Sequence, residues 1–179
     1  MKTQKQLINI LIPICAILSL VMVALIFLPS VGYETMATHN HYNFSLWNFV
    51  IAIFMPDNSN NMVITNYLNS AQSGPSGYAV AITSLLLFIA LIVLTAMLII
   101  ENVSKENKTF YISLVTLIIN LVNIICVAVF CDSITNKKAG TILGTNGYIM
   151  WGSILLLVFN FIIFCVLLYL KFFYKGKTK

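Results

Sequence analysis

The sequence predicts an all-α membrane protein, a four-transmembrane-helix bundle with a small extracytoplasmic cap of β-strand character. Sixty per cent of the 179 residues are hydrophobic and 8% are charged, whereas a soluble domain carries roughly 25% charged residues. The apolar residues gather in four runs, each long enough to cross a ~30 Å hydrocarbon core as a helix. These runs cover about residues 7–28, 77–100, 110–131 and 147–170.

The first run needs to be distinguished from a signal peptide, because lysines precede it. It exceeds the usual apolar length of about 7–15 residues, and no small-x-small cleavage site follows it closely. Cys15 ends a stretch that resembles a lipoprotein cleavage box, but Ile14 stands where such a box requires a small side chain. We therefore expect a retained first span that bends at Pro13, where the helix loses a backbone donor.

Lysine placement predicts the orientation. The chain has no arginine, and only Lys137 and Lys138 lie on the expected outer side. The positive-inside rule then places both termini in the cytoplasm of a multi-pass protein of the cell membrane. We interpret the net charge of +5 as anchoring charge at the lipid bilayer, and we expect no nucleic-acid partner. The lysines on the expected inner side are Lys2, Lys5, Lys105, Lys108, Lys171, Lys175, Lys177 and Lys179.

The first outer loop, residues 29–76, is predicted to form the cap, and the second outer loop, residues 132–146, is shorter. Residues 42–46 alternate between apolar and polar, as in a half-buried strand, and residues 62–68 are expected to return as a second strand. Residues 46–55 are apolar but too short to span, so they form either a buried strand or an interfacial helix. The aromatic residues that we expect to contact a partner through this cap are Tyr42, Phe44, Trp47 and Phe49.

Two apolar runs open with the same pattern. "SGPSGY" precedes the second run and "LGTNGY" precedes the fourth, so both read Gly-x-x-Gly-Tyr. We interpret the pattern as two equivalent points where a repeated helical hairpin meets the membrane, with glycines that permit close backbone approach. The aromatic residues expected at the membrane interface are Tyr33, Tyr78, Tyr148 and Trp151.

Polar residues within the spans are predicted to face the bundle interior, because an unpaired amide in hydrocarbon costs several kcal/mol. Asn120 and Asn160 lie at similar depth, and we expect them to approach each other. The cluster serves either as interhelical hydrogen bonding or as a polar pathway. Its members share helix faces by their spacing and are Ser113, Thr116, Asn120, Asn123, Ser153 and Asn160.

The residue patterns that support enzymatic or metal chemistry are not found. There is no nucleotide loop, nucleophile elbow or Cys-x-x-Cys pair, so we expect no enzyme and no cofactor. Glu101 and Asp132 lie at span ends, whereas a proton-coupled exporter usually needs a carboxylate within a span. His39 and His41 lack an evident third ligand apart from the distant Glu34, so we expect no metal site.

The topology resembles the claudin-type tetraspan arrangement, which implies four spans, two internal termini and a β-prone first outer loop. "SLWNF" at 45–49 is similar to the Leu-Trp of the claudin first loop, and "GTNGYIMWGSILLL" is similar to the start of the fourth claudin helix. The paired first-loop cysteines of that family are absent. "FLPSVGY" after the first run resembles small uncharacterised four-span proteins of Gram-positive-type bacteria, a resemblance that implies no activity.

Two functional hypotheses follow. The first is a non-enzymatic envelope protein that acts through its outer cap by contact with itself, as a homo-oligomer, or with another membrane protein. The second is a small transporter or a bacteriocin-immunity-type factor that uses the polar bundle interior. The richness in lysine, asparagine and isoleucine indicates an AT-rich bacterial genome, so we do not assign the Asn43 sequon to glycosylation.

Overall fold

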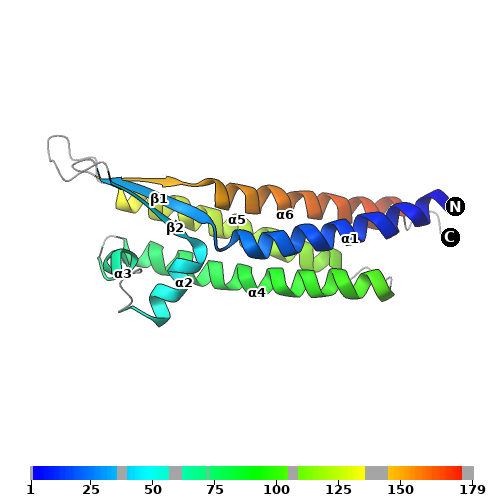
Figure 1. The fold of residues 1–179 in the computed structure, drawn as a ribbon, viewed down its shortest axis with the longest axis horizontal. Coiled ribbons are helices and arrows are strands. Elements are labelled where there is room, and N and C mark those ends of the chain that lie inside the picture. The colour runs from blue at the N-terminus through cyan, green and yellow to red at the C-terminus, as the bar shows by residue number, and fades with distance from the viewer. Residues whose placement is uncertain are drawn as a thin grey trace.

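The computed structural model describes residues 2–35, 40–56, 62–71, 73–104, 109–135 and 145–174. Among these residues, four long helices lie side by side in an elongated bundle, and a small sheet with two short helices covers one end, which we call the cap end (Figure 1). The long helices are α1 (Lys2–Leu25), α4 (Gly74–Ser104), α5 (Thr109–Ile134) and α6 (Trp151–Tyr169). A π-helical turn, Leu170–Tyr174, continues α6 at the far end, where α1 also begins.

Within the described part of the chain, three helices are long and apolar enough to cross a membrane, over Gly74–Ile100, Thr109–Ile134 and Trp151–Phe172. A shorter apolar helix covers Ile10–Leu25 of α1. The second and third predicted spans, 77–100 and 110–131, fall inside α4 and α5. The fourth prediction, 147–170, began too early, because residues 145–149 form a strand and α6 starts only at Trp151.

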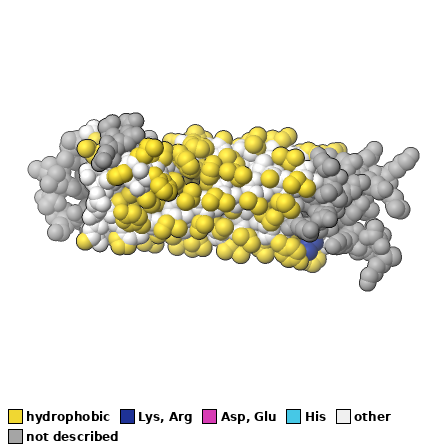
Figure 2. Space-filling model, turned by 90° about the horizontal axis from the view of Figure 1, so that it is seen from below, with side chains coloured by type: hydrophobic (Ala, Val, Ile, Leu, Met, Phe, Trp, Pro, Cys, Tyr) yellow, Lys and Arg dark blue, Asp and Glu magenta, His cyan; other side chains and the backbone are white. Residues whose placement is uncertain are grey.

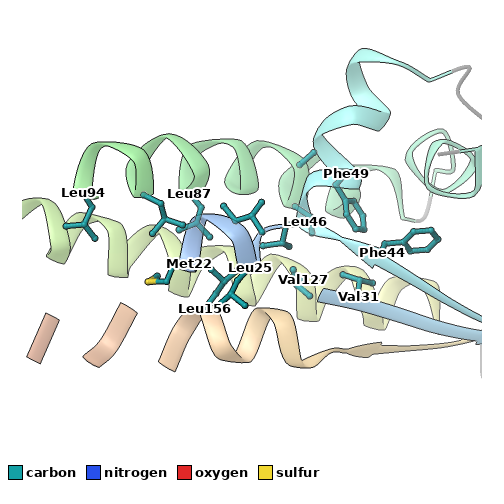
Figure 3. Close-up of a cluster of buried hydrophobic side chains, with 14 of the residues drawn as sticks. Met22, Leu25, Val31, Phe44, Leu46, Phe49, Leu87, Leu94, Val127 and Leu156 are labelled. Atoms are coloured by element: carbon teal, nitrogen blue, oxygen red, sulfur yellow. The ribbon is translucent and has the colours of Figure 1, made fainter. Parts of the chain in front are cut away.

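Each helix buries one face in the bundle and presents an apolar face outward. On α6 the buried residues Gly152, Leu156, Ile163 and Leu167 recur at helical spacing, while Phe161 between them is exposed. Figure 3 shows Leu87, Leu94, Leu156 and neighbouring side chains meeting between the helices, and the same core continues toward Phe44 and Phe49 at the cap end. Because both faces are apolar, the helices are suited to a lipid surround.

The sheet has three antiparallel strands in the order β2-β1-β3. The central strand β1 (Pro29–Thr35) continues from α1, β2 (His41–Ser45) follows it, and β3 (Thr145–Ile149) leads into α6. Thus β1 joins segments more than one hundred residues apart, with Val31 opposite Ile149. The end of the predicted second outer loop, 132–146, and the start of the predicted fourth span therefore contribute a strand to the cap, which the sequence did not predict.

Of the two strands predicted for the first outer loop, one is a strand and the other is a helix. Residues 42–46 correspond to β2, but residues 62–68 form the helix α3 (Met62–Leu68) and do not pair with it. Residues 46–55 were expected to form either a buried strand or an interfacial helix, and the structure has the helix α2 (Leu46–Phe54) there. We use "cap" below for β1, β2, β3, α2 and α3.

The two Gly-x-x-Gly-Tyr copies have different structures, so the predicted equivalence was wrong. Gly74, Gly77 and Tyr78 lie in the first turns of α4, whereas Gly147 and Tyr148 lie in β3. Close packing explains both copies. A Cβ at Gly77 would lie 2.8 Å from the Leu68 side chain, and one at Gly147 would lie 2.6 Å from the carbonyl oxygen of Cys131.

The strand β1 is fixed to the start of α6. The Met150 N–H donates to the Ser30 carbonyl oxygen at 2.9 Å, and the Ser153 hydroxyl donates to the same oxygen at 3.3 Å. A Cβ at Gly152 would lie 2.4 Å from the Pro29 carbonyl oxygen. Only glycine permits this approach of strand to helix without a shift of the backbone.

Candidate contact surface and polar interior

The turn from β2 into α2 is set by a capping box. The backbone N–H of Asn48 bonds to the Ser45 hydroxyl at 3.2 Å, and the Asn48 side-chain oxygen accepts from the Ser45 backbone N–H at 2.9 Å. The side chains of the two residues are also hydrogen-bonded to each other. This reciprocal pairing satisfies backbone donors that a helix start otherwise leaves open. An extended strand can therefore become a helix within one residue.

Aromatic rings pack the elements of the cap against one another and against the bundle. Tyr33 of β1 stacks on Tyr42 of β2, with ring centroids 4.8 Å apart, and Tyr67 of α3 meets Tyr33 edge-on at 5.7 Å. Phe49 of α2 contacts Phe130 of α5 edge-on at 5.0 Å. Such pairs each contribute about 0.5–1.5 kcal/mol beyond their buried area. The aromatic residues of the cap therefore bind it to its own helices.

Two of the four predicted contact residues were wrong. Phe44 and Phe49 are 8% and 0% exposed, so neither can form a contact surface. Trp47 is half-buried between Phe27 and Phe88, with centroid distances of 5.4 Å and 5.0 Å. Tyr42 remains exposed beside His41.

Of the four aromatic residues expected at the membrane interface, two are exposed, one is half-buried and one is buried. Tyr78 and Trp151 are exposed, and their place at a membrane interface stays a prediction. Tyr148 is half-buried, and its ring covers the backbone of Gly32. Tyr33 was wrongly placed at the interface, because it is only 5% exposed within the cap. Burial raises the pKa of Tyr33 to about 12, and the neighbouring Tyr67 and Tyr42 phenols add to the shift.

All six residues of the predicted polar interior are buried. Asn123 of α5 donates from Nδ2 to the hydroxyls of Thr83 at 2.9 Å and of Ser84 at 3.0 Å on α4. A second polar contact, which the sequence analysis missed, joins Ser19 of α1 to Thr95 of α4 at 2.6 Å. Both contacts join different helices within their apolar segments.

The expected contact between Asn120 and Asn160 is not a hydrogen bond. Neither the nitrogen nor the oxygen of the Asn160 side chain has a hydrogen-bond partner among the described residues, and the Asn120 nitrogen also lacks one. The hydroxyls of Ser113 and Thr109, further toward the far end, are likewise unpaired within the described chain. Thr116 donates instead to the Ile112 carbonyl oxygen, one turn back on its own helix. Half of the polar interior is thus paired and half is not.

The signals for the missed partners were present in the sequence. Thr83 and Ser84 are adjacent hydroxyls in the second apolar run, and Ser19 and Thr95 are isolated hydroxyls in the first and second runs. A search for polar residues at matching depth in neighbouring runs would have paired them, because hydroxyl groups in hydrocarbon seek a partner.

The remaining candidate features are sparse. His41 Nε2 lies 3.9 Å from Oε1 of Glu34, an exposed ion pair when the histidine is protonated, while His39 lies outside the described residues. Within the described part of the chain, no group of three His, Cys, Asp or Glu residues could hold a metal ion. An open groove of about 310 Å³ between α1 and α4 is lined by residues that include Pro13, Ile17 and Thr95.

The fold and its apolar helices define a candidate multi-pass membrane protein whose outer helix faces suit contact with a lipid bilayer. No protein-family model, no curated protein and no solved structure matches the chain.

Proposed function

We propose that the protein is a non-enzymatic, four-span protein of the cell membrane, with both termini in the cytoplasm, whose cap contacts a second copy or another membrane protein. The helix α1 supplies the fourth span. It packs against α4 and α6, and its outward side chains Ile10, Ile14 and Leu20 are apolar and exposed.

The charge at the two ends of the bundle supports the orientation. Lys171 at the far end lies with Nζ 4.0 Å from the ring centroid of Phe110 and 3.9 Å from that of Tyr111. A lysine held by aromatic rings at the end of an apolar helix is typical of a membrane boundary. Most other lysines flank the same end in the sequence, which favours the cytoplasm there.

The open edge of β2 is the observation that carries the proposal. Among the described residues, β2 pairs with β1 on one side only, and His41, Tyr42 and Asn43 are exposed. The opposite edge of the sheet belongs to β3, which packs against α5. An exposed strand edge offers backbone donors and acceptors to a further strand. A partner would therefore extend the sheet at β2.

Photo-cross-linking in native membranes tests this contact. We expect p-benzoylphenylalanine in place of Tyr42 to yield one adduct of defined mass, whose second chain is identified by mass spectrometry. The matched control carries the probe in place of Phe161, an exposed aromatic residue on α6, and should yield no protein adduct. Adding Asn43→Lys to the Tyr42 probe should abolish the adduct, because a charge on an edge strand opposes strand addition. Uncross-linked monomer from both probes would refute the proposal.

The unpaired Asn160 favours a second candidate, a small transporter or immunity-type factor with a polar pathway. Its amide is fully buried and has no hydrogen-bond partner among the described residues, although such a group costs free energy. If the pathway is used, Asn120→Leu with Asn160→Leu should leave a folded protein that fails to complement a deletion strain. Complementation by the folded double variant would reject this candidate function. It would not bear on the contact proposed for the cap.

A further inference from the structure

Apart from Asn48, whose side chain closes the capping box with Ser45, the helix α2 is apolar. Its buried face carries Leu46, Phe49, Val50 and Ala52. Its outward face carries Trp47, Ile51 and Phe54, whose spacing of four and seven residues places them together, and the C-cap residue Met55 follows them. Phe54 and Met55 are 70% and 61% exposed, and no charged residue occurs between Leu46 and Phe54. A surface helix in water would normally turn polar side chains outward.

This outward face continues the outer surface of the bundle. The Trp47 ring contacts Phe27 at the end of α1 and Phe88 of α4. Leu86 and Ile89, next to Phe88 on α4, are exposed. Figure 2 looks at the side on which α2 and α4 lie in Figure 1, and hydrophobic side chains cover it from the cap end toward the far end. Among the described residues, a basic side chain appears on this face only at the far end.

The depth of Trp47 follows from helix geometry. Phe88 lies twelve residues before Ile100, where the apolar segment of α4 ends, a distance of about 18 Å at 1.5 Å per residue. A hydrocarbon core of about 30 Å that starts at Ile100 reaches about 12 Å beyond Phe88. Because the Trp47 and Phe88 ring centroids are 5.0 Å apart, the Trp47 ring lies within the depth of the hydrocarbon.

We propose that α2 is an interfacial helix immersed in the leaflet on the cap side, with Trp47 among the acyl chains and Ile51 and Phe54 against lipid. The occupant of this face is lipid because the face continues the apolar outer surfaces of α1 and α4 and carries no charge that would select a protein. The capping box of Ser45 and Asn48 provides hydrogen-bond acceptors for backbone N–H groups at the start of α2, which a low-dielectric environment requires. The contact proposed for β2 involves a different part of the cap, so either proposal can fail alone.

Tryptophan quenching tests the immersion, since the chain has only two tryptophans, Trp47 and Trp151. In Trp151→Phe, all emission comes from Trp47. Reconstituted into phosphatidylcholine vesicles with brominated acyl chains, this variant should lose most of its emission. Its acrylamide Stern–Volmer constant should be several-fold below that of free tryptophan. The matched variant Trp47→Phe reports Trp151 at the start of α6 as the reference for a membrane boundary.

Two outcomes overturn the proposal. Strong acrylamide quenching without bromolipid quenching would place α2 in water, and protection from both quenchers would mean that protein covers it. A second measurement keeps both tryptophans and so does not depend on their replacement. A nitroxide on Phe54→Cys, in a background without the native cysteines, should collide more with oxygen than with a water-soluble nickel chelate. The reverse ratio would refute immersion even if Trp151→Phe failed to fold.

Discussion

Two asparagines in the same bundle should respond in opposite directions to replacement by leucine. Asn123 donates two interhelical hydrogen bonds, and bonds of this kind average about 0.6 kcal/mol within membranes. Asn123→Leu should therefore lower the free energy of unfolding by about 1 kcal/mol. The loss stays small because Thr83 and Ser84 also donate to backbone carbonyl oxygens of α4.

Asn160→Leu removes a side chain that is buried with both polar atoms unpaired among the described residues. An unsatisfied buried group costs about 1–3 kcal/mol, so its removal should raise the free energy of unfolding by about 1–2 kcal/mol after some loss to misfit of the leucine. The neighbouring Phe161→Leu is the control, because Phe161 faces outward and its replacement should change stability little.

The assay is reversible unfolding in mixed micelles of a mild detergent and sodium dodecyl sulfate, followed by circular dichroism. We expect the free energy of unfolding to increase for Asn160→Leu and to decrease for Asn123→Leu, relative to the Phe161→Leu control. A fall in stability for Asn160→Leu as large as that for Asn123→Leu would show that Asn160 is hydrogen-bonded in the membrane. That result would refute the assignment of Asn160 as an unpaired buried amide.

Three further predictions concern the cap. Gly152→Ala should destabilise the cap by about 1–3 kcal/mol, because the new Cβ meets the Pro29 carbonyl oxygen, whereas Gly→Ala changes are otherwise mild in helices. Amide hydrogen exchange in β1 measures this loss of stability. Ser45→Ala should cost about 1 kcal/mol through the lost helix cap and speed exchange at the start of α2. The raised pKa of Tyr33 means that the folded cap favours the neutral phenol. Cap stability should therefore be full below pH 10 and fall between about pH 10 and 12, and Tyr33→Phe should remove much of that fall in a near-ultraviolet titration.

Much of the bundle could be predicted from hydropathy alone. Runs of apolar residues need internally paired backbones in lipid, so the helices α4 and α5 follow directly from length and composition. The burial of Asn120, Asn123 and Asn160 also followed from the cost of exposing an amide to hydrocarbon. The hydrogen-bond partners of these asparagines could not be predicted. Spacing within one apolar run shows which residues share a helix face, but it does not show which neighbouring helix that face contacts.

The cap was harder to predict because its contacts are distant in sequence. Residues 62–68 have the β-branched composition of a strand, yet they form a helix, since propensity in so short a segment yields to packing. The pairing of Val31 with Ile149 has no local signal. Phe44 and Phe49 were expected at a partner surface, but an aromatic side chain fits a partner or its own core equally well.

The pairing of β1 with β3 has a consequence for the order of assembly. During synthesis, β1 leaves the ribosome long before residues 145–149 exist, so the cap cannot close until the chain that leads into α6 has been made. Contacts of such sequence separation form slowly, because a long loop must be closed before any of them is gained. Until then β1 can pair only with β2, and its second edge stays open to other strands. Closure by β3 is thus the step that completes the sheet, and it ties the maturation of the cap to the synthesis of the chain that leads into α6.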